Sequence, residues 1–204
     1  MAVLDNGAGI PLGFGGLAVS IGDHIAHFYQ SKEEMFAVLT PYIGEGIRRG
    51  DTCVVITGPQ GAGEMGRWLG PDRLGGHRAG EVGQLIVETD VATLQEMRAK
   101  LERIAVDALA PANVVRLAWD GNWFPNRLAS PVDLVRFEVL YEELSGRWGG
   151  RRLALCQLDL TRFGGDMVME AFRAHHLCIM GRILLRSPLH LSPKSLLKTL
   201  EERE

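Results

Sequence analysis

Short apolar runs alternate along this chain with longer stretches of helical periodicity. The runs have the length and composition of strands, and they lie at residues 24–29, 52–57, 84–88, 114–119 and 152–159. Because parallel strands need a crossover helix between them, this alternation predicts an α/β fold with a mainly parallel sheet and helices on both faces. A hairpin at residues 176–185, adding antiparallel edge strands, and a helix from residue 194 are expected to follow.

The helix after the first strand has clear signals at both ends. Ser31 and Glu34 form a capping box, and Gly50 follows the last apolar position. Pro41 lies inside this helix and predicts a kink. The sequence therefore predicts a helix over residues 31–49, and further helices are expected at residues 63–69, 91–109, 130–146 and 166–174.

The length and the net charge of the chain limit the number of domains and the kinds of partner that it can have. We expect a glycine-rich N-terminal arm over residues 1–21, either loose or added as an edge segment, and a single domain over residues 22–204. The net charge of −3 without a basic run argues against a direct nucleic-acid partner, and no apolar stretch has the length of a membrane span. Three cysteines within apolar runs indicate reduced thiols, so a cytoplasmic protein without a signal peptide is expected.

A glycine-rich loop follows the second strand. Gly58 and Gly63 have the spacing of a phosphate-binding loop, but Glu64 stands where that loop carries its lysine. A carboxylate at this place repels the phosphates it would have to bind, so we expect a degenerate phosphate loop. Gly61 also begins a dinucleotide-type glycine pattern that fits poorly, because two residues separate it from Gly58. The alternative is a glycine loop that only turns the chain.

Polar and aromatic residues gather where two later strands end. Asp120 ends one strand beside Trp119 and Trp123, and this carboxyl edge is where open α/β sheets usually bind ligands. The aromatic rings are expected to line an apolar pocket or to belong to the core. Near the end of the last core strand, Gln157 and Asp159 need polar partners, supplied by a ligand or by the following helix.

The histidines do not form a familiar metal-binding pattern. His24 and His27 are three residues apart on a strand and point to opposite faces, and His175 is directly followed by His176. Their spacing to the cysteines matches no known zinc motif, so no metal site and no cofactor are expected. His24 is predicted to be a buried polar group with a role, near Tyr29. Nucleophilic catalysis has no sequence support, and the chain is not expected to be an enzyme.

Several segments together resemble one family, the MEDS domain, which is the sensory domain of methanogen and methylotroph regulators. The resemblance covers roughly residues 22–190, and the segments that carry it are 23–29, 31–34, 39–46, 83–88, 116–120, 155–159 and 175–182. Its most specific parts are the opening with His24, Phe28 and Tyr29 and the strand with Cys156 and Gln157. The resemblance implies a degenerate RecA-like fold that senses small organic molecules.

The resemblance also implies which residues form the site. The leading histidine of the family corresponds to His24, and its opening aromatic pair to Phe28 and Tyr29. The Gly-Glu pair after the third core strand corresponds to Trp119 and Asp120, so the acidic group is kept while an indole replaces the glycine. Any pocket there is expected to be smaller or rearranged.

These observations predict a non-catalytic, cytoplasmic sensory domain that binds a small organic molecule. The family domain commonly lies beside an output module, and none is seen in this sequence, so a separate signalling or regulatory protein is the expected partner. A homodimer is also possible on this reading. The alternatives are a ligand-free interaction module in a kinase or sigma-factor circuit, or a protein with residual nucleotide binding.

Overall fold

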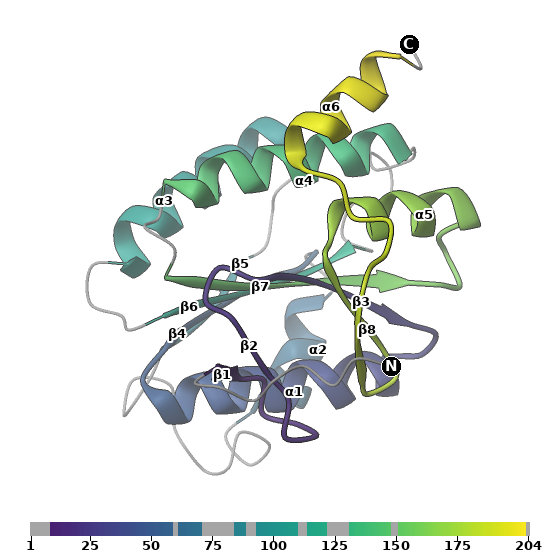
Figure 1. The fold of residues 1–204 in the computed structure, drawn as a ribbon. Coiled ribbons are helices and arrows are strands. Elements are labelled where there is room, and N and C mark those ends of the chain that lie inside the picture. Colours follow the sequence, from purple (N-terminus) through teal and green to yellow (C-terminus); the bar gives the residue numbers. More distant parts are fainter. Residues whose placement is uncertain are drawn as a thin grey trace.

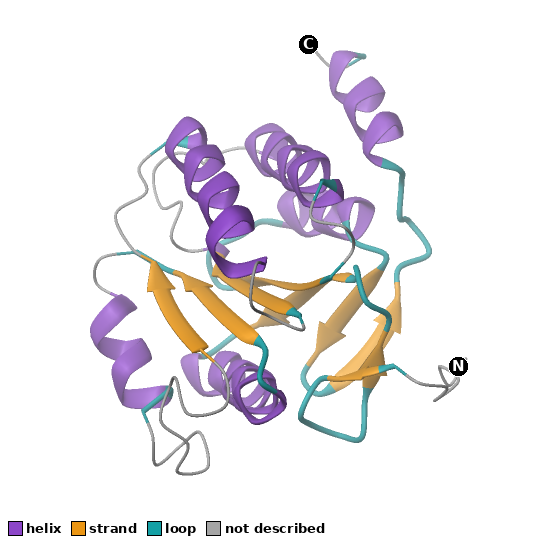
Figure 2. Ribbon diagram, turned by 90° about the vertical axis from the view of Figure 1, so that its left-hand side faces the viewer, coloured by secondary structure: helices purple, strands orange, loops and turns teal. Residues whose placement is uncertain are grey.

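The computed structural model describes residues 9–58, 61–70, 84–88, 93–109, 114–121, 131–147 and 151–202. Its centre is a seven-stranded sheet in the order β5-β4-β6-β7-β3-β8-β9, shown between two helical layers in Figures 1 and 2. The parallel strands are β3 (His24–Tyr29), β4 (Thr52–Ile56), β5 (Gln84–Glu88), β6 (Val115–Asp120), β7 (Arg152–Asp159) and β8 (Leu177–Met180). The predicted α/β class with a mainly parallel sheet is confirmed.

The strand order and the right-handed crossover rule together fix which helix covers which face. From β3 through β4 to β5 the chain moves toward one edge, and the connecting helices α1 (Lys32–Arg49) and α2 (Gly61–Trp68) lie on one face. From β5 back through β6 and β7 to β8 it moves the other way. The helices α3 (Leu94–Leu109), α4 (Pro131–Gly146) and α5 (Gly165–Ala174) therefore cover the opposite face (Figure 1).

The predicted caps of α1 are present. Ser31 Oγ accepts a hydrogen bond from Glu34 N, and Gly50 ends the helix in the left-handed conformation at φ 81°. The Glu34 carboxylate accepts from the Gln30 amide, one residue before the expected position. Helix α3 begins three residues later than predicted, because Thr93 caps it: Thr93 Oγ1 accepts from the Glu96 amide, and the Thr93 amide donates to the Glu96 carboxylate.

Each face of the sheet carries its own hydrophobic core. Alternation along β3 places Ala26 and Phe28 in the core under α3, α4 and α5, and Ile25 and Tyr29 in the core over α1 and α2. All six residues of β3 are buried, as expected for a central strand covered on both sides. This alternation also decides which face each polar residue of β3 can reach.

The N-terminal segment has a structure of its own within residues 9–21. Strands β1 (Ile10–Pro11) and β2 (Ala18–Val19) form a two-stranded antiparallel sheet, and Leu12 and Phe14 are buried in the core beside α1. This part is neither loose nor added to the edge of the main sheet. The division of the chain at residue 21 stays a prediction.

The C-terminal hairpin and helix follow the prediction. Strand β9 (Ile183–Arg186) pairs antiparallel with β8 through a turn at Gly181, whose φ is 59°. Helix α6 (Pro193–Glu201) then returns over α4, where Leu196 is buried against Val135 (Figure 1). Among the helices described, none is long and apolar enough to span a membrane.

Candidate functional site

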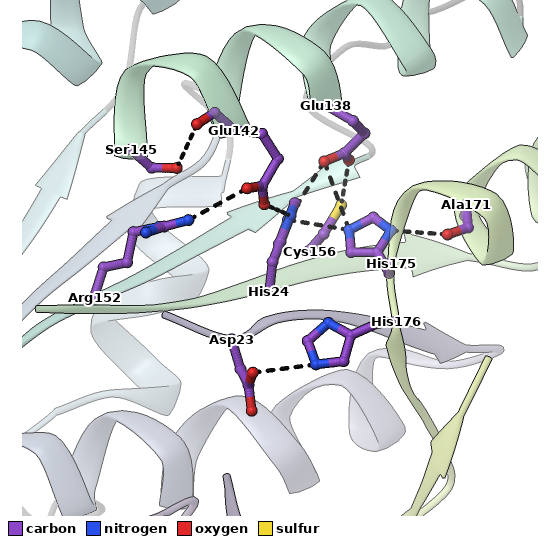
Figure 3. Close-up of polar contacts among 10 residues, drawn as sticks. All are labelled: Asp23, His24, Glu138, Glu142, Ser145, Arg152, Cys156, Ala171, His175 and His176. Carbon is purple, nitrogen blue, oxygen red and sulfur yellow. Dashed lines mark hydrogen bonds and ion pairs between the residues drawn. The ribbon is translucent and has the colours of Figure 1, made fainter. Parts of the chain in front are cut away.

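A buried cluster of histidine and glutamate side chains lies at the amino end of the sheet (Figure 3). His24 is the first residue of β3, and His175, the C-cap of α5, lies two residues before β8, which pairs with β3 in parallel. Glu138 and Glu142 lie one turn apart on α4, on the side that faces the sheet. The start of one strand, the approach to another and one helix therefore bring together four polar side chains from three distant parts of the sequence.

Three atoms of the cluster lie very close to one another. His24 Nε2 and His175 Nε2 are 3.0 Å apart. Glu138 Oε2 is 3.4 Å from the first nitrogen and 3.6 Å from the second. All three side chains are buried, with at most 4% of each exposed. Three buried polar atoms this close together are stable only if a proton or a cation lies between them.

The other ring nitrogens fix the tautomers of both histidines. His175 Nδ1 lies 2.8 Å from the carbonyl oxygen of Ala171, which only accepts, so Nδ1 carries the hydrogen. His24 Nδ1 donates to Glu142 Oε1 at 3.2 Å, and the same carboxylate accepts from Arg152 Nη2 at 3.3 Å. In the neutral state both Nε2 atoms therefore present lone pairs to each other.

Burial controls the charge of these groups. Desolvation lowers the pKa of His24 and of His175 well below the usual histidine value, with Arg152 adding to the effect on His24. Desolvation also raises the pKa of Glu138 well above the usual carboxyl value. Without a bound cation, the cluster is therefore driven toward its neutral forms.

Aromatic rings and a thiol surround the cluster. The His24 ring packs between Trp119 and Tyr141, with ring centroids 5.1 Å and 4.6 Å away. Cys156 Sγ lies 3.5 Å from Glu138 Oε1, and burial raises the pKa of that thiol. The thiol is therefore protonated and donates to Glu138 Oε1, while Glu138 Oε2 has no hydrogen-bond partner among the described residues.

A cavity of about 180 Å³ opens beside this cluster. Its polar side consists of His24, Glu138 and Glu142, together with two further histidines, and its apolar side comes from α4, α5 and α6. The lining residues are Gly22, His24, Glu138, Val139, Glu142, Ala174, His176, His190, Pro193 and Leu196. The cavity is thus located where the C-terminal helix covers the buried cluster.

The residues predicted to form a single pocket are divided between the two faces and ends of the sheet. His24 and Tyr29 lie at opposite ends of β3, so the expected proximity of the two is wrong. Phe28, Trp119 and Cys156 lie in the core under α3, α4 and α5, on the face of the sheet to which the His24 side chain points. Of these, Trp119 and Cys156 approach the cluster, whereas Phe28 stacks on Phe172 instead.

The polar groups at the carboxyl edge are bonded to the protein itself. Tyr29 Oη donates to Asp120 Oδ1 at 3.2 Å, and burial, with a smaller effect of that carboxylate, raises the pKa of the tyrosine. Asp159 Oδ1 accepts from the backbone and hydroxyl of Thr161. Trp123 lies outside the described residues.

Gln157 finds its partners on the other face. Its Nε2 donates to the Met35 carbonyl at 3.3 Å and lies 3.3 Å from His27 Nδ1. These partners come from α1 and β3 and not from the following helix. Its amide is thus part of the buried polar structure beneath α1.

The glycine-rich segment differs from a phosphate-binding loop because much of it is helical. Gly61, Gly63 and Glu64 all belong to α2, whereas Gly58 follows β4, and residues 59–60 lie outside the described residues. Lys32 forms an ion pair with Glu64. The glutamate charge is thus partly offset by a neighbouring cation, which weakens the repulsion on which the sequence argument depended.

Sequence reasoning missed Glu138, Glu142 and the partnership of His175 with His24. A signal for the glutamates was present, since two carboxylates at i and i+4 lie on the apolar side of the helix at 131–146. The expectation of no metal site rested on sequence spacing alone. That spacing carries no information about residues brought together by strand order.

Comparisons with known proteins give a family, a sequence relative and a protein with a similar fold. Residues 23–176 match the sequence model of MEDS, described as the methanogen/methylotroph, DcmR sensory domain. The transcriptional repressor DcmR of Methylorubrum extorquens (strain DSM 6343 / CIP 106787 / DM4) is 24% identical over 161 residues, which are 78% of this chain and 60% of the repressor. This chain therefore corresponds to less than two thirds of the repressor.

Among solved structures, the ATPase EscN from the type III secretion system of enteropathogenic E. coli aligns with a TM-score of 0.50. The sequences are 16% identical, and the alignment covers 91% of this chain and 53% of the ATPase chain. At this identity the likeness concerns the fold alone. The expected RecA-like architecture is confirmed.

Proposed function

The chain belongs to the MEDS family of sensory domains, and from this premise we propose that it is a non-catalytic sensor of a small organic molecule. The observation that carries the proposal is the cavity of about 180 Å³ beside the buried cluster of His24, Glu138 and His175. A relative of this chain is named a transcriptional repressor, which supports a regulatory role. The sensor would bind its ligand in the cavity and pass the signal to a partner protein.

The size of the cavity limits the ligand. An apolar cavity of about 150 Å³ is known to hold a benzene molecule, so this cavity suits a molecule with only a few carbon atoms. Its mixed lining selects for an amphipathic ligand. Val139, Ala174 and Leu196 offer an apolar side, while His24 and Glu142 offer polar atoms to a single functional group.

Helix α6 provides a route for the signal. Pro193 and Leu196 belong to α6, His190 lies just before it, and all three line the cavity. The same helix is held to α4 by the buried Leu196. A ligand that fills the cavity contacts α4 and α6 together, and its binding free energy then favours one position of α6 over others.

The hairpin β8–β9 offers a surface for the partner. Strand β9 is at the edge of the sheet, and Met180, Ile183 and Leu185 are 42%, 62% and 37% exposed. An exposed apolar edge strand can pair with a strand of another chain. This hairpin precedes α6 in the chain, so the ligand cavity and the partner surface are connected through residues 187–192.

A ligand-free interaction module is the second candidate, and the same exposed edge strand favours it. Nucleotide hydrolysis has weaker support. Glu64 occupies the position that needs a lysine, and a neighbouring cation, Lys32, is already paired with it. We therefore expect that magnesium and ATP together do not stabilise the protein.

The proposal is tested by calorimetry and thermal unfolding with short-chain alcohols, thiols, amines and carboxylic acids. We expect saturable one-to-one binding by a member of this panel, accompanied by a higher melting temperature. Val139→Phe should abolish the binding, because the larger ring occupies the cavity. The matched control is Val87→Phe at an exposed position of β5, which should bind normally.

Two outcomes would overturn the proposal. One is the absence of binding by every compound of the panel at millimolar concentration. The other is binding that survives Val139→Phe and His24→Ala, which would locate the ligand elsewhere. Recovery of a stable protein partner by the cavity-filled variant would support the ligand-free alternative instead.

A further inference from the structure

Glu138 Oε2 is a buried oxygen that has no hydrogen-bond partner in the part of the chain that the structure describes, and two imidazole nitrogens lie within 3.6 Å of it. We propose that His24, Glu138 and His175 bind a divalent transition metal ion, with zinc as the ion that fits best. The ligand atoms are Nε2 of both histidines and Oε2 of the glutamate. The inference goes beyond the proposed function and does not depend on it.

The distances between the three atoms match the edges of a tetrahedral site. Zinc binds histidine nitrogen and carboxylate oxygen at about 2.0–2.2 Å, so the edges of a tetrahedron around it measure about 3.3–3.6 Å. The observed edges are 3.0, 3.4 and 3.6 Å. An ion can enter once the two imidazole rings, whose centroids are 4.1 Å apart in an edge-on contact, turn and separate so that both lone pairs point at it.

The tautomers are those that metal binding requires. Glu142 Oε1 and the Ala171 carbonyl each accept from an Nδ1 of the pair, which leaves both Nε2 atoms as lone-pair donors. Metal-bound histidines almost always make such a second hydrogen bond, to a carboxylate or a backbone carbonyl. Arg152 in turn holds Glu142 in place. The outer contacts of the site are thus already formed.

Alternative explanations leave these atoms less satisfied. Two Nε2 lone pairs at 3.0 Å repel each other, and a protonated Glu138 at 3.4–3.6 Å can serve only one of them. A proton shared between the two histidines would relieve the contact, but both Nε2 atoms would then donate to each other and not to Glu138 Oε2, and Glu142 would be the carboxylate that accepts from the charged pair, through His24 Nδ1. A metal ion accepts all three lone pairs at once.

The fourth position would face the cavity. His24 and Glu138 both line it, so an ion held between them and His175 borders the open space. Three protein ligands with one open position is the arrangement in which zinc binds water or an added ligand. Such an ion would give the cavity a preference for molecules with a lone-pair donor, for example a thiolate or a carboxylate.

The test uses the untagged full chain, stripped with a chelator and titrated with zinc in competition with a coloured indicator. We expect one zinc per chain, with affinity at least about 100-fold lower in Glu138→Gln and in His175→Gln, because even loss of an outer contact costs 10–100-fold. His27→Gln is the matched control, since that histidine is buried on the other face of β3. Its zinc affinity should be unchanged.

Surface histidines are tested separately. His176 and His190 lie near each other beside the cavity, and His176 contacts Asp23, so they form a possible adventitious site. The double variant His176→Gln/His190→Gln should keep its one zinc. Loss of zinc in this double variant, or retention of full affinity in Glu138→Gln, would overturn the proposal.

Nitrogen NMR of the histidines in the wild-type protein needs no substitution, so it tests the proposal even if the variants fail to fold. Zinc should shift the Nε2 signals of His24 and His175 while both Nδ1 atoms keep their hydrogens. A hydrogen on either Nε2 that persists in the presence of excess zinc would show that a shared proton occupies the site, and the proposal would be wrong.

Discussion

The ion pair between Arg116 and Asp51 should be one of the most sensitive points of the fold. Both side chains are at most 1% exposed, and Arg116 Nε donates to Asp51 Oδ2 at 2.8 Å. The same guanidinium donates to the carbonyl of Pro11 at 3.0 Å and lies 3.4 Å from that of Tyr42. It therefore connects β6, the start of β4, α1 and the N-terminal sheet.

Asp51→Ala leaves a buried guanidinium without its counter-charge. Breaking a buried pair in this way typically costs about 3–5 kcal/mol. A domain of this size has about 5–15 kcal/mol of stability in total, so the variant should lose about a fifth of it or more. The corresponding decrease of the melting temperature is about 10 °C, at about 2–4 °C per kcal/mol.

Urea unfolding followed by circular dichroism measures the loss directly. The matched control is Glu143→Ala, which breaks an exposed pair with Arg147 and should cost less than about 0.5 kcal/mol. Adding Arg116→Met to Asp51→Ala should recover part of the loss, because no buried charge then remains. Equal stability of Asp51→Ala and Glu143→Ala would refute the argument.

Three further predictions concern other parts of the structure. Burial lowers the pKa of His27 to about 4, so this residue alone should account for a loss of about 2 kcal/mol of stability between pH 7 and pH 5, as the unfolded chain takes up the proton; in parallel denaturation curves His27→Gln should lose about 2 kcal/mol less than the wild type over this range. Gly13→Ala should destabilise by about 1–3 kcal/mol in thermal unfolding, because φ is +89° and the new Cβ would lie 2.1 Å from the Pro41 carbonyl oxygen; a neutral result would contradict this packing. Ile183→Lys should leave the melting temperature unchanged but abolish any dimer seen by sedimentation equilibrium, and a dimer that persists would place the interface elsewhere.

Much of the fold could be predicted from local patterns. The strands, the cap at Ser31, the end of α1 at Gly50 and the turn at Gly181 follow from periodicity and from backbone preferences of single residues. The start of α3 was misplaced because the cap at Thr93 lies two residues inside the range that periodicity suggested. The N-terminal segment was harder, since the burial of Leu12 and Phe14 depends on α1 and not on neighbours in the sequence.

The candidate site could be predicted only in part. His24 was recognised as a buried polar residue, and Trp119 and Cys156 as ligand-binding candidates, although Trp119 was expected beside Asp120 at the carboxyl edge and neither was expected to approach His24. Glu138 was overlooked because the role of a carboxylate on the apolar face of a helix depends on the residues packed against it. Here those residues, His24 and His175, come from distant parts of the sequence. The expected role of Tyr29 beside His24 was wrong, because the two residues lie at opposite ends of one strand.

The sequence by itself determined the secondary structure and the α/β class, because these depend on side-chain periodicity and on contacts within a few residues. Only the tertiary structure decided that His24 and His175 meet. They are 151 residues apart, and they touch because β8 pairs with β3 after the chain has crossed the sheet and returned. Such a pairing is set by the packing of whole layers, so no local pattern in the sequence encodes it.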